Sequence, residues 1–285
     1  MRRCFALIAV LAMLLPVTSG SAALGTAEMS FDQVSTRTDE PVATGLVGRS
    51  WVWGSRLTSV VDESYAEAPG GVRSVQYFDK ARMELGVPGD SIWSVTTGLL
   101  AEELITGRMQ IGNDTFVQRN PATLPVAGDP DSRSTPTYAA LNPLTTYQPI
   151  PNGWTIIQTV DASGSVAVDL RLTAYGVTAV DVGSPTDHTV ASTFWEFMTS
   201  RGVVYDIHTN EHHVDRLFPN PFYATGYPIT EAYWTTTKVA GVERDVLVQC
   251  FERRCLTYTP DNPTGWQVEF GNIGQHYYQW RYETP

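Results

Sequence analysis

Two cysteines near the C-terminus, Cys250 and Cys255, are the residues whose spacing most directly suggests chemistry. They enclose Phe-Glu-Arg-Arg in a stretch that otherwise has the composition of extended chain. Such a pair could ligate a metal, act as a redox couple or form a disulfide. A structural zinc site needs four ligands, usually two close cysteine pairs or added histidines, and a redox pair has two intervening residues. A disulfide fits the spacing best if the chain is exported, because disulfides form in oxidising compartments.

The N-terminus predicts export. Two arginines precede an apolar run over residues 5–15, and small residues follow as far as Ala23. This order is typical of a signal peptide, here residues 1–23 with cleavage after Ala23. The apolar run is shorter than the roughly 20 residues of a membrane-spanning helix, and no later stretch is apolar enough. We therefore expect a secreted or cell-surface protein with no integral membrane segment after cleavage, in which Cys250 and Cys255 form a disulfide.

The composition narrows the classes of partner. The formal net charge is −11, and removal of a signal peptide would make it more negative. Nucleic acids and anionic lipids select surfaces rich in Lys and Arg, so neither is an expected partner. Because 42% of the residues are hydrophobic and 11% aromatic, the chain can build folded cores.

Other residues that could do chemistry do not form a recognisable motif. His208, His212 and His213 lie in the stretch "IHTNEHHVD", which has neither helical periodicity nor the His-Glu-x-x-His order of zinc peptidases. We predict a loop there, and no metal site, cofactor or catalytic residue anywhere in the chain. A glycosidase needs only two suitably separated carboxylates, so the sequence leaves that class open.

The strongest pattern is an internal repeat. Residues 75–104 align without a gap to residues 248–277 at an offset of 173, as between Val75 and Val248. Cys250 and Cys255 align with Tyr77 and Arg82, so the repeated unit does not require thiols there. The identical pairs are Val75/Val248, Gln76/Gln249, Phe78/Phe251, Trp93/Trp266, Val95/Val268 and Gly98/Gly271.

The second copy resembles the LGFP repeat in the stretches "TGYPITEAYW", "VQCFERRCLTYTP" and "WQVEFGNIGQHYYQW". That module has a Leu-Gly-x-Pro opening, a Gln-x-Phe-Glu-x-Gly strand and a Val-x-Gly-x-Ile ending. Here Thr225 stands in place of the leucine and Arg254 in place of the last glycine of the strand, while the first copy has Arg56 in place of the proline. The resemblance implies a secreted bacterial protein that attaches to, or modifies, the cell envelope. Envelope polysaccharide or glycolipid is then the expected partner.

These patterns predict a mainly β fold with a few short helices. One helix is expected in residues 98–107, with Gly107 as its C-terminal stop. Trp93 and Trp266 occupy equivalent positions of the repeat and are expected in the core. We expect two homologous β-hairpin-plus-helix modules flanking a β-rich insertion. The expected divisions are a signal peptide (1–23), a linker (24–48), a first LGFP-like module (49–110), a Pro-rich connection (111–153), the β-rich insertion (154–185), a helix (186–203) and a second LGFP-like module (204–285).

Candidate ligand-binding residues come from the aromatic side chains and the hairpin turn. Rings with an apolar face and a polar edge suit sugar binding, which favours Trp53, Trp234 and Tyr258. Glu252 and Arg253 could form a polar recognition tip or simply a solvated turn. We expect a non-enzymatic protein that binds or organises envelope glycan or glycolipid. The alternatives are an envelope-acting hydrolase with paired carboxylates and a structural surface protein that binds other proteins.

Overall fold

The structure is a computed structural model that describes residues 19–86 and 92–284. Most of the expected signal peptide lies outside these residues. The first helix, α1 (Ser19–Ala43), spans the expected cleavage point after Ala23. Within the described ranges, no helix combines the length and the apolar character needed to cross a membrane.

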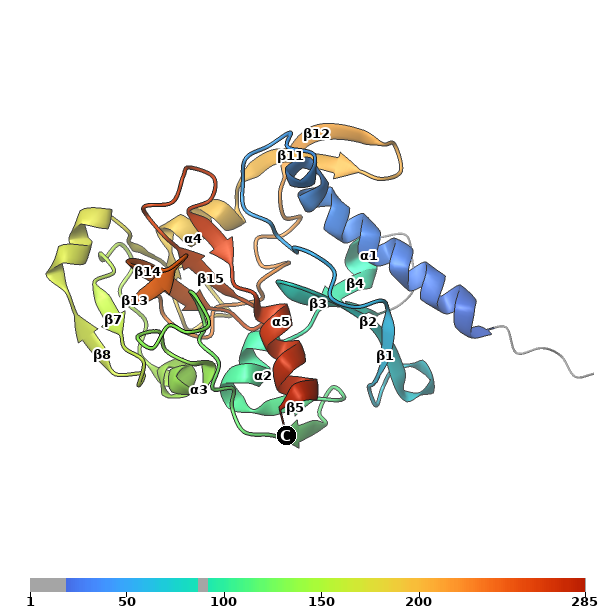
Figure 1. Cartoon of the computed structure of the whole chain (residues 1–285), viewed down its shortest axis with the longest axis horizontal. Helices are drawn as coiled ribbons and strands as arrows, with labels where there is room; N and C mark the ends of the chain where they lie inside the picture. The colour runs from blue at the N-terminus through green and yellow to red at the C-terminus, as the bar shows by residue number, and fades with distance from the viewer. Residues whose placement is uncertain (1–18, 87–91, 285) are drawn as a thin grey trace, which may run out of the picture.

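The fold is mainly β, as predicted, with two main sheets on either side of a pair of short helices, α2 (Leu100–Thr106) and α5 (Ile273–Tyr278) (Figure 1). Strands that alternate polar and apolar residues can bury one face on a helix. The first sheet has the order β1-β2-β3-β4. Its strands are β1 (Val61–Ser64), β2 (Val72–Phe78), β3 (Ala81–Leu85) and β4 (Val95–Thr97).

The second sheet has six strands in the order β16-β15-β14-β13-β7-β8. All of its pairs are antiparallel except β7 and β13, which run parallel. Its strands are β7 (Gln158–Val160), β8 (Val166–Val168), β13 (Tyr233–Val239), β14 (Val242–Cys250), β15 (Cys255–Tyr258) and β16 (Val268–Phe270). The expected insertion therefore contributes β7 and β8 to this sheet rather than forming a unit of its own.

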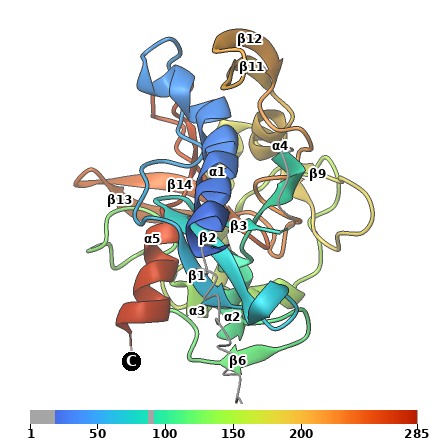
Figure 2. The same cartoon turned by 90° about the vertical axis from the view of Figure 1, so that its right-hand side faces the viewer.

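Residues 24–48, expected to be a linker, instead contain most of α1, so the linker prediction was wrong. The helix buries Ala27, Phe31 and Val34 and lies along the outer face of the first sheet (Figure 2). Its polar composition was misleading, because serine and threonine side chains can hydrogen-bond the carbonyl four residues earlier in a helix. Ser30 and Ser35 do this, to the carbonyls of residues 26 and 31.

The remaining helices are short. α2 (Leu100–Thr106) ends at Gly107, which adopts the left-handed conformation, as predicted from its sequence. α4 (Ser192–Met198) is shorter than the predicted helix over 186–203, because the chain ahead of it pairs in a strand. The others are α3 (Tyr138–Leu141) and α5 (Ile273–Tyr278), with 3₁₀ turns at Pro69–Gly71, Ile92–Ser94, Asn142–Thr146 and Leu170–Tyr175 and a π turn at Gln279–Glu283.

Three small hairpins complete the fold. Of the histidine stretch predicted as a loop, residues 207–210, with His208, do form a turn, whereas residues 211–215 belong to a strand, in which His212 lies 2.5 Å from Glu40 of α1. The hairpins are β5 (Arg108–Gln110) with β6 (Phe116–Gln118), β9 (Ala179–Val180) with β10 (Val190–Ala191), and β11 (Arg201–Asp206) with β12 (Glu211–Arg216).

Two hydrophobic clusters hold the sheets together. One lies between the facing sides of the two sheets, where α2 and α5 pack, and includes Val75, Val248 and the two cysteines. The other covers their opposite sides and includes Phe78 and Phe251 together with residues of α1 and α4. The face of the first sheet that meets α5 also carries the charged side chains described next.

Candidate ligand-binding site

Residues 53–106 and 225–278 have matching hydrogen bonds around their hairpin turns. The carboxylate of Asp79 accepts a hydrogen bond from the backbone N–H of Ser55 at 2.9 Å. The carboxylate of Glu252 accepts one from the N–H of Tyr227 at 3.0 Å. The acid of each turn therefore fixes the chain that precedes its own sheet, which is the structural role that charged turn residues can fulfil.

The residue before each of these N–H groups is a glycine, and both the backbone conformation and the space around it require a glycine there. Gly54 and Gly226 have φ values of 73° and 69°, a region that favours glycine. A Cβ on Gly54 would lie 2.9 Å from the Asp79 carboxylate, and one on Gly226 would lie 2.5 Å from that of Glu252. The glycine at the start of each segment thus has a physical reason.

The two segments also contact each other reciprocally. The N–H of Glu102 in α2 donates to the carbonyl of Glu252 at 3.1 Å, and the N–H of Gln275 in α5 donates to the carbonyl of Asp79 at 3.2 Å. Each helix therefore begins on the hairpin turn of the other segment. In a two-fold interface, residue i contacts j and j contacts i, and this intramolecular interface has that form.

The basic residue of each turn also hydrogen-bonds the other segment. Lys80 Nζ donates to the carbonyl of Phe270 at 2.8 Å, and Arg253 Nη1 donates to the carbonyl of Thr97. Glu252 and Arg253, considered above as a recognition tip, are thus both half-buried where the two segments meet. Only Arg253 also faces a pocket.

A buried ionic cluster occupies the α5-facing side of the first sheet. Arg82 is fully buried at its centre and donates through Nε to Glu84 at 2.8 Å. Its guanidinium also lies 3.5 Å from the carboxylate of Glu63 and 3.8 Å from that of Glu103. The other members are Arg73, Tyr77, Tyr277, Arg281 and Tyr282.

Opposite charges and phenol groups compensate this burial. Burial alone would lower the pKa of Arg82, but the surrounding tyrosines and glutamates raise it well above its ordinary value. Burial acts to raise the pKa of Glu63, yet Arg82 and Arg281 hold it below its ordinary value. Buried charges are tolerated only when they are paired in this way, so the cluster forms a rigid support.

The corresponding place in the second sheet holds a disulfide. Cys250 and Cys255 are paired across β14 and β15, as Tyr77 and Arg82 are across β2 and β3. The Cα atoms of the two cysteines are 4.0 Å apart and their sulfurs are bonded, which confirms the predicted disulfide.

A pocket of about 480 Å³ opens beside the ionic cluster. We call it the Tyr65 pocket. Arg73 forms one wall: its guanidinium carbon lies 4.0 Å from the centre of the Tyr65 ring, and its Nη1 lies 2.7 Å from Glu84. The residues that define the pocket are Tyr65, Glu67, Arg73, Glu84, Asn113 and Arg253.

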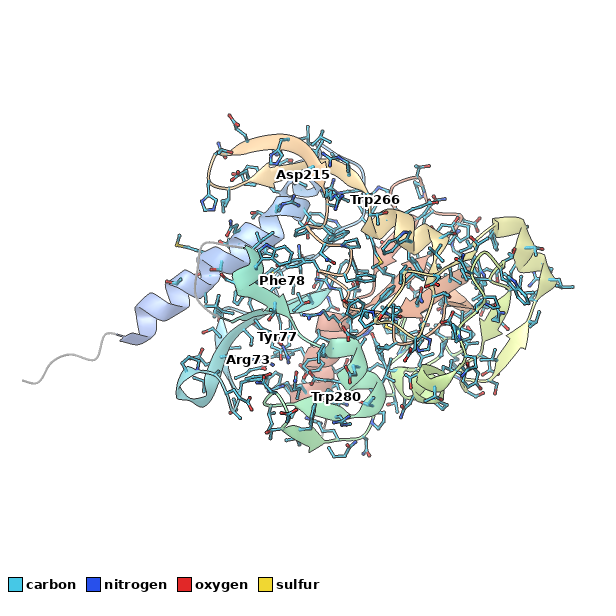
Figure 3. All side chains as sticks on the ribbon, turned by 180° about the vertical axis from the view of Figure 1, so that it is seen from behind. Arg73, Tyr77, Phe78, Asp215, Trp266 and Trp280 are labelled. Atoms are coloured by element: carbon cyan, nitrogen blue, oxygen red, sulfur yellow. A yellow bond between two sulfur atoms is a disulfide. The ribbon has the colours of Figure 1, made fainter. Side chains whose placement is uncertain are left out.

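Hydrogen bonds between two loops fix the outer wall of this pocket. The Tyr65 hydroxyl donates to Asn113 Oδ1 at 2.9 Å, and the N–H of Asn113 donates to Glu67 at 2.7 Å. Figure 3 shows Arg73 and Tyr77 on the same part of the first sheet, well away from Trp266 and Asp215. Five of the six defining residues come from the first segment and the loop after it, whereas Arg253 comes from the second.

The other candidate ligand-binding residues lie elsewhere. Trp53 and Trp234 are only 2% and 1% exposed, so neither ring faces solvent. Tyr258 is half-buried and packs 6.2 Å from Trp234, centre to centre. Trp93 and Trp266, expected in the core as equivalent residues, differ: Trp93 is 60% exposed, whereas Trp266 is half-buried.

Sequence reasoning missed Tyr65, Arg73 and Glu84. The repeat contained a usable signal, because Arg73 and Glu84 correspond to Val246 and Thr257 of the other copy. Charges that replace apolar or neutral residues on the inward face of a strand pair indicate a local specialisation.

A second pocket, of about 750 Å³, lies over residues 145–152 and 186–189. It covers Glu231, a buried carboxylate that accepts hydrogen bonds from the N–H groups of Ile150 and Thr189. His188 lies between Glu231, 3.0 Å from Nδ1, and the carbonyl of Thr145, 3.2 Å from Nε2. Both neighbours are acceptors, so only doubly protonated His188 can donate to both. This histidine therefore holds loops together and has no free nitrogen for chemistry.

No group of three or more His, Cys, Asp or Glu side chains in residues 19–86 and 92–284 could hold a metal ion. Comparison of the chain with models of known protein families, with curated proteins and with solved structures gave no match.

Proposed function

We propose that the chain is a secreted, non-enzymatic protein that binds cell-envelope glycan or glycolipid through two LGFP-like modules. The module proposal is supported by the hydrogen bonds that recur at the offset of the repeat, and by β4 and β16, whose limits are 173 residues apart, as between Val95 and Val268. Export is supported by the Cys250–Cys255 disulfide, a bond rare in reducing compartments.

The Tyr65 pocket carries the binding proposal. Its walls present a phenol, an amide, carboxylates and guanidinium groups, which together can donate to and accept from sugar hydroxyls. The ionic cluster beneath it fixes Arg73 and Glu84 before a ligand arrives, and a pre-organised site loses less entropy on binding. The lining also includes apolar residues such as Pro69, Leu85 and Leu99, and a pocket with both polar and apolar walls suits a sugar, which has hydroxyls and an apolar ring face.

The contacts of the Glu84 carboxylate favour a binding function over hydrolysis. A glycosidase needs one carboxyl group that gives up a proton and another that attacks or activates water. Glu84 Oε1 accepts from Arg82, and Glu84 Oε2 is paired with Arg73. Both oxygens of Glu84 are therefore engaged by guanidinium groups of the protein and are not free to act on a substrate. Glu84 therefore serves to position Arg73.

The test is retention of the chain without residues 1–23 on purified, insoluble envelope polysaccharide, with soluble sugar measured in the same tube. We expect retention without release of fragments. Tyr65→Ala removes the ring against which Arg73 packs and should reduce retention by about tenfold or more, the effect of losing one well-packed aromatic contact.

Tyr147→Ala is the matched control, because Tyr147 is a 46% exposed tyrosine that lines the pocket near His188. Its retention should equal that of the unmodified protein. Equal losses for both variants, or no retention of the folded protein at all, would count against binding at the Tyr65 pocket. Release of sugar fragments would point to the hydrolase alternative.

A further inference from the structure

The Tyr65 pocket has unused hydrogen-bond donors. The Nε atoms of Arg73 and Arg253 are both buried and have no hydrogen-bond partner among the described residues. The side chain of Arg73 is only 10% exposed. Because these Nε atoms have no exposed surface, a ligand would meet the two guanidinium groups through their Nη2 atoms, which are not buried and have no hydrogen-bond partner among the described residues.

Three of the four carboxylate oxygens in the pocket already have partners. The oxygens of Glu84 are taken by Arg82 and Arg73, and Glu67 Oε2 accepts the N–H of Asn113. The side chain of Arg253 hydrogen-bonds only Thr97 and makes no ion pair within the part of the chain that the structure describes. Among the charged side chains of the pocket, Arg253 is therefore the cation without a carboxylate partner.

We propose that the Tyr65 pocket selects glycans that carry a carboxylate, bound by the guanidinium groups of Arg73 and Arg253; this rests on the glycan-binding function proposed above. A guanidinium offers a planar fork of N–H donors that matches the two oxygens of a carboxylate. A uronic acid places that carboxylate on a sugar ring whose hydroxyls can meet Tyr65 and Asn113. The selected class is acidic polysaccharide.

The two arginines come from the two segments. Arg73 is in β2 of the first, whereas Arg253 is in the turn between β14 and β15 of the second. A carboxylate that bridges them would bind only when the segments are docked as they are here. The acid site thus depends on the reciprocal interface, and it has no counterpart on the opposite side, where Val246 replaces Arg73 and Lys80 replaces Arg253.

The experiment is calorimetric titration of the chain without residues 1–23 with trimers of galacturonic and glucuronic acid, each as the free acid and as the methyl ester. The ester keeps the sugar ring and removes the charge. We expect at least one acid to bind. Its ester should bind with an affinity at least about tenfold lower, because the charge-assisted hydrogen bonds are lost.

Arg253→Lys tests the site without removing the interface contact, because Lys80 makes the corresponding contact to Phe270 in the other segment. It should weaken binding of the acid by about tenfold and leave the thermal midpoint unchanged. Lys80→Arg, the matched control on the opposite side, should change neither.

Several results would overturn the proposal. If the esters bind as tightly as the acids, or Arg253→Lys binds the acid normally, carboxylate selection is wrong and glycan binding stands. If neither acids nor esters bind while the envelope polysaccharide still retains the protein, selection is again wrong. If that retention fails as well, the proposed function fails with it.

Discussion

The β2–β3 and β14–β15 hairpins are linked across their strands by different chemistry. At the same register, the first sheet pairs Tyr77 with Arg82, and the second pairs Cys250 with Cys255. Around Arg82 lies a cluster of glutamates, tyrosines and further arginines. Around the cysteines lie apolar residues of the shared core. A disulfide needs no partners beyond itself, whereas a buried arginine requires acids nearby.

This difference explains why the pocket adjoins only one sheet. The ionic cluster extends to the surface through Arg73 and Glu84, whose counterparts in the second sheet are Val246 and Thr257. The first hairpin therefore acquired polar groups that can meet a ligand, and the second acquired a covalent link. In the proposed function, the first segment serves recognition, whereas the second segment carries the covalent link.

The largest expected effect is that of Arg82→Met. Removing one partner of a buried ionic network leaves the remaining charges uncompensated, which typically costs about 3–5 kcal/mol. The free energy of unfolding, measured in denaturant, should fall by about that amount. Arg244→Met is the control, because Arg244 pairs with Asp261 at the surface, at 3.5 Å, and such pairs contribute about 0–1 kcal/mol.

A double variant sharpens the interpretation. Glu84→Thr installs the residue that the second sheet has at the corresponding position. If charge imbalance causes the loss, Arg82→Met with Glu84→Thr should be less destabilised than the sum of the two single variants, because contacting residues are coupled. Additive losses would mean that Arg82 acts through packing alone.

The sequence predicted features that depend on local chemistry. The disulfide, the helix that ends at Gly107 and the mainly β character followed from spacing, turn residues and alternation. The prediction of a linker in place of α1 failed, because this helix, although rich in Ser and Thr, is stabilised by packing on the first sheet and by hydrogen bonds from its hydroxyl groups to its own backbone carbonyls. It could not predict the Tyr65 pocket, because Arg253 reaches Thr97 only through folding of the whole chain.

The second expected effect is the pH dependence of the free energy of unfolding that arises from His276 of α5 and Glu103 of α2, which occupy corresponding positions of the repeat. Burial lowers the pKa of His276 to about 4 and raises that of Glu103. An unfolded histidine titrates near 6.5, so below that pH the unfolded chain takes up a proton that folded His276 refuses. Stability should fall from pH 6.5 toward 4, by at most about 3 kcal/mol. Glu103 acts in the opposite direction, because its folded form binds a proton more readily than its unfolded form.

His276→Gln separates these contributions, since glutamine can still hydrogen-bond the hydroxyl of Tyr138, which lies 3.0 Å from His276. Its free energy of unfolding should lose less between pH 6.5 and 4.5 than that of the unmodified protein. Identical losses would show that His276 is not responsible for the acid sensitivity.

The third effect tests the feature that the segments share. Gly54→Ala and Gly226→Ala each place a methyl group against a turn carboxylate at positive φ, and each should cost about 2–3 kcal/mol. Gly70→Ala is the control: its φ is 72° with open space around it, so only the backbone cost of about 1 kcal/mol applies. Chemical denaturation measures all three. A Gly226 variant no worse than the Gly70 variant would contradict the close approach to Glu252.

The smallest effect is that of the disulfide. In the chain-entropy description, a link that closes so short a loop contributes about 2 kcal/mol. The variant with Cys250→Ala and Cys255→Ala should lose about that much stability and become insensitive to reductant, while ligand retention at the Tyr65 pocket is unchanged. Reduced retention would show that the two hairpins are coupled through α2 and α5, and that the second copy serves recognition as well as stability.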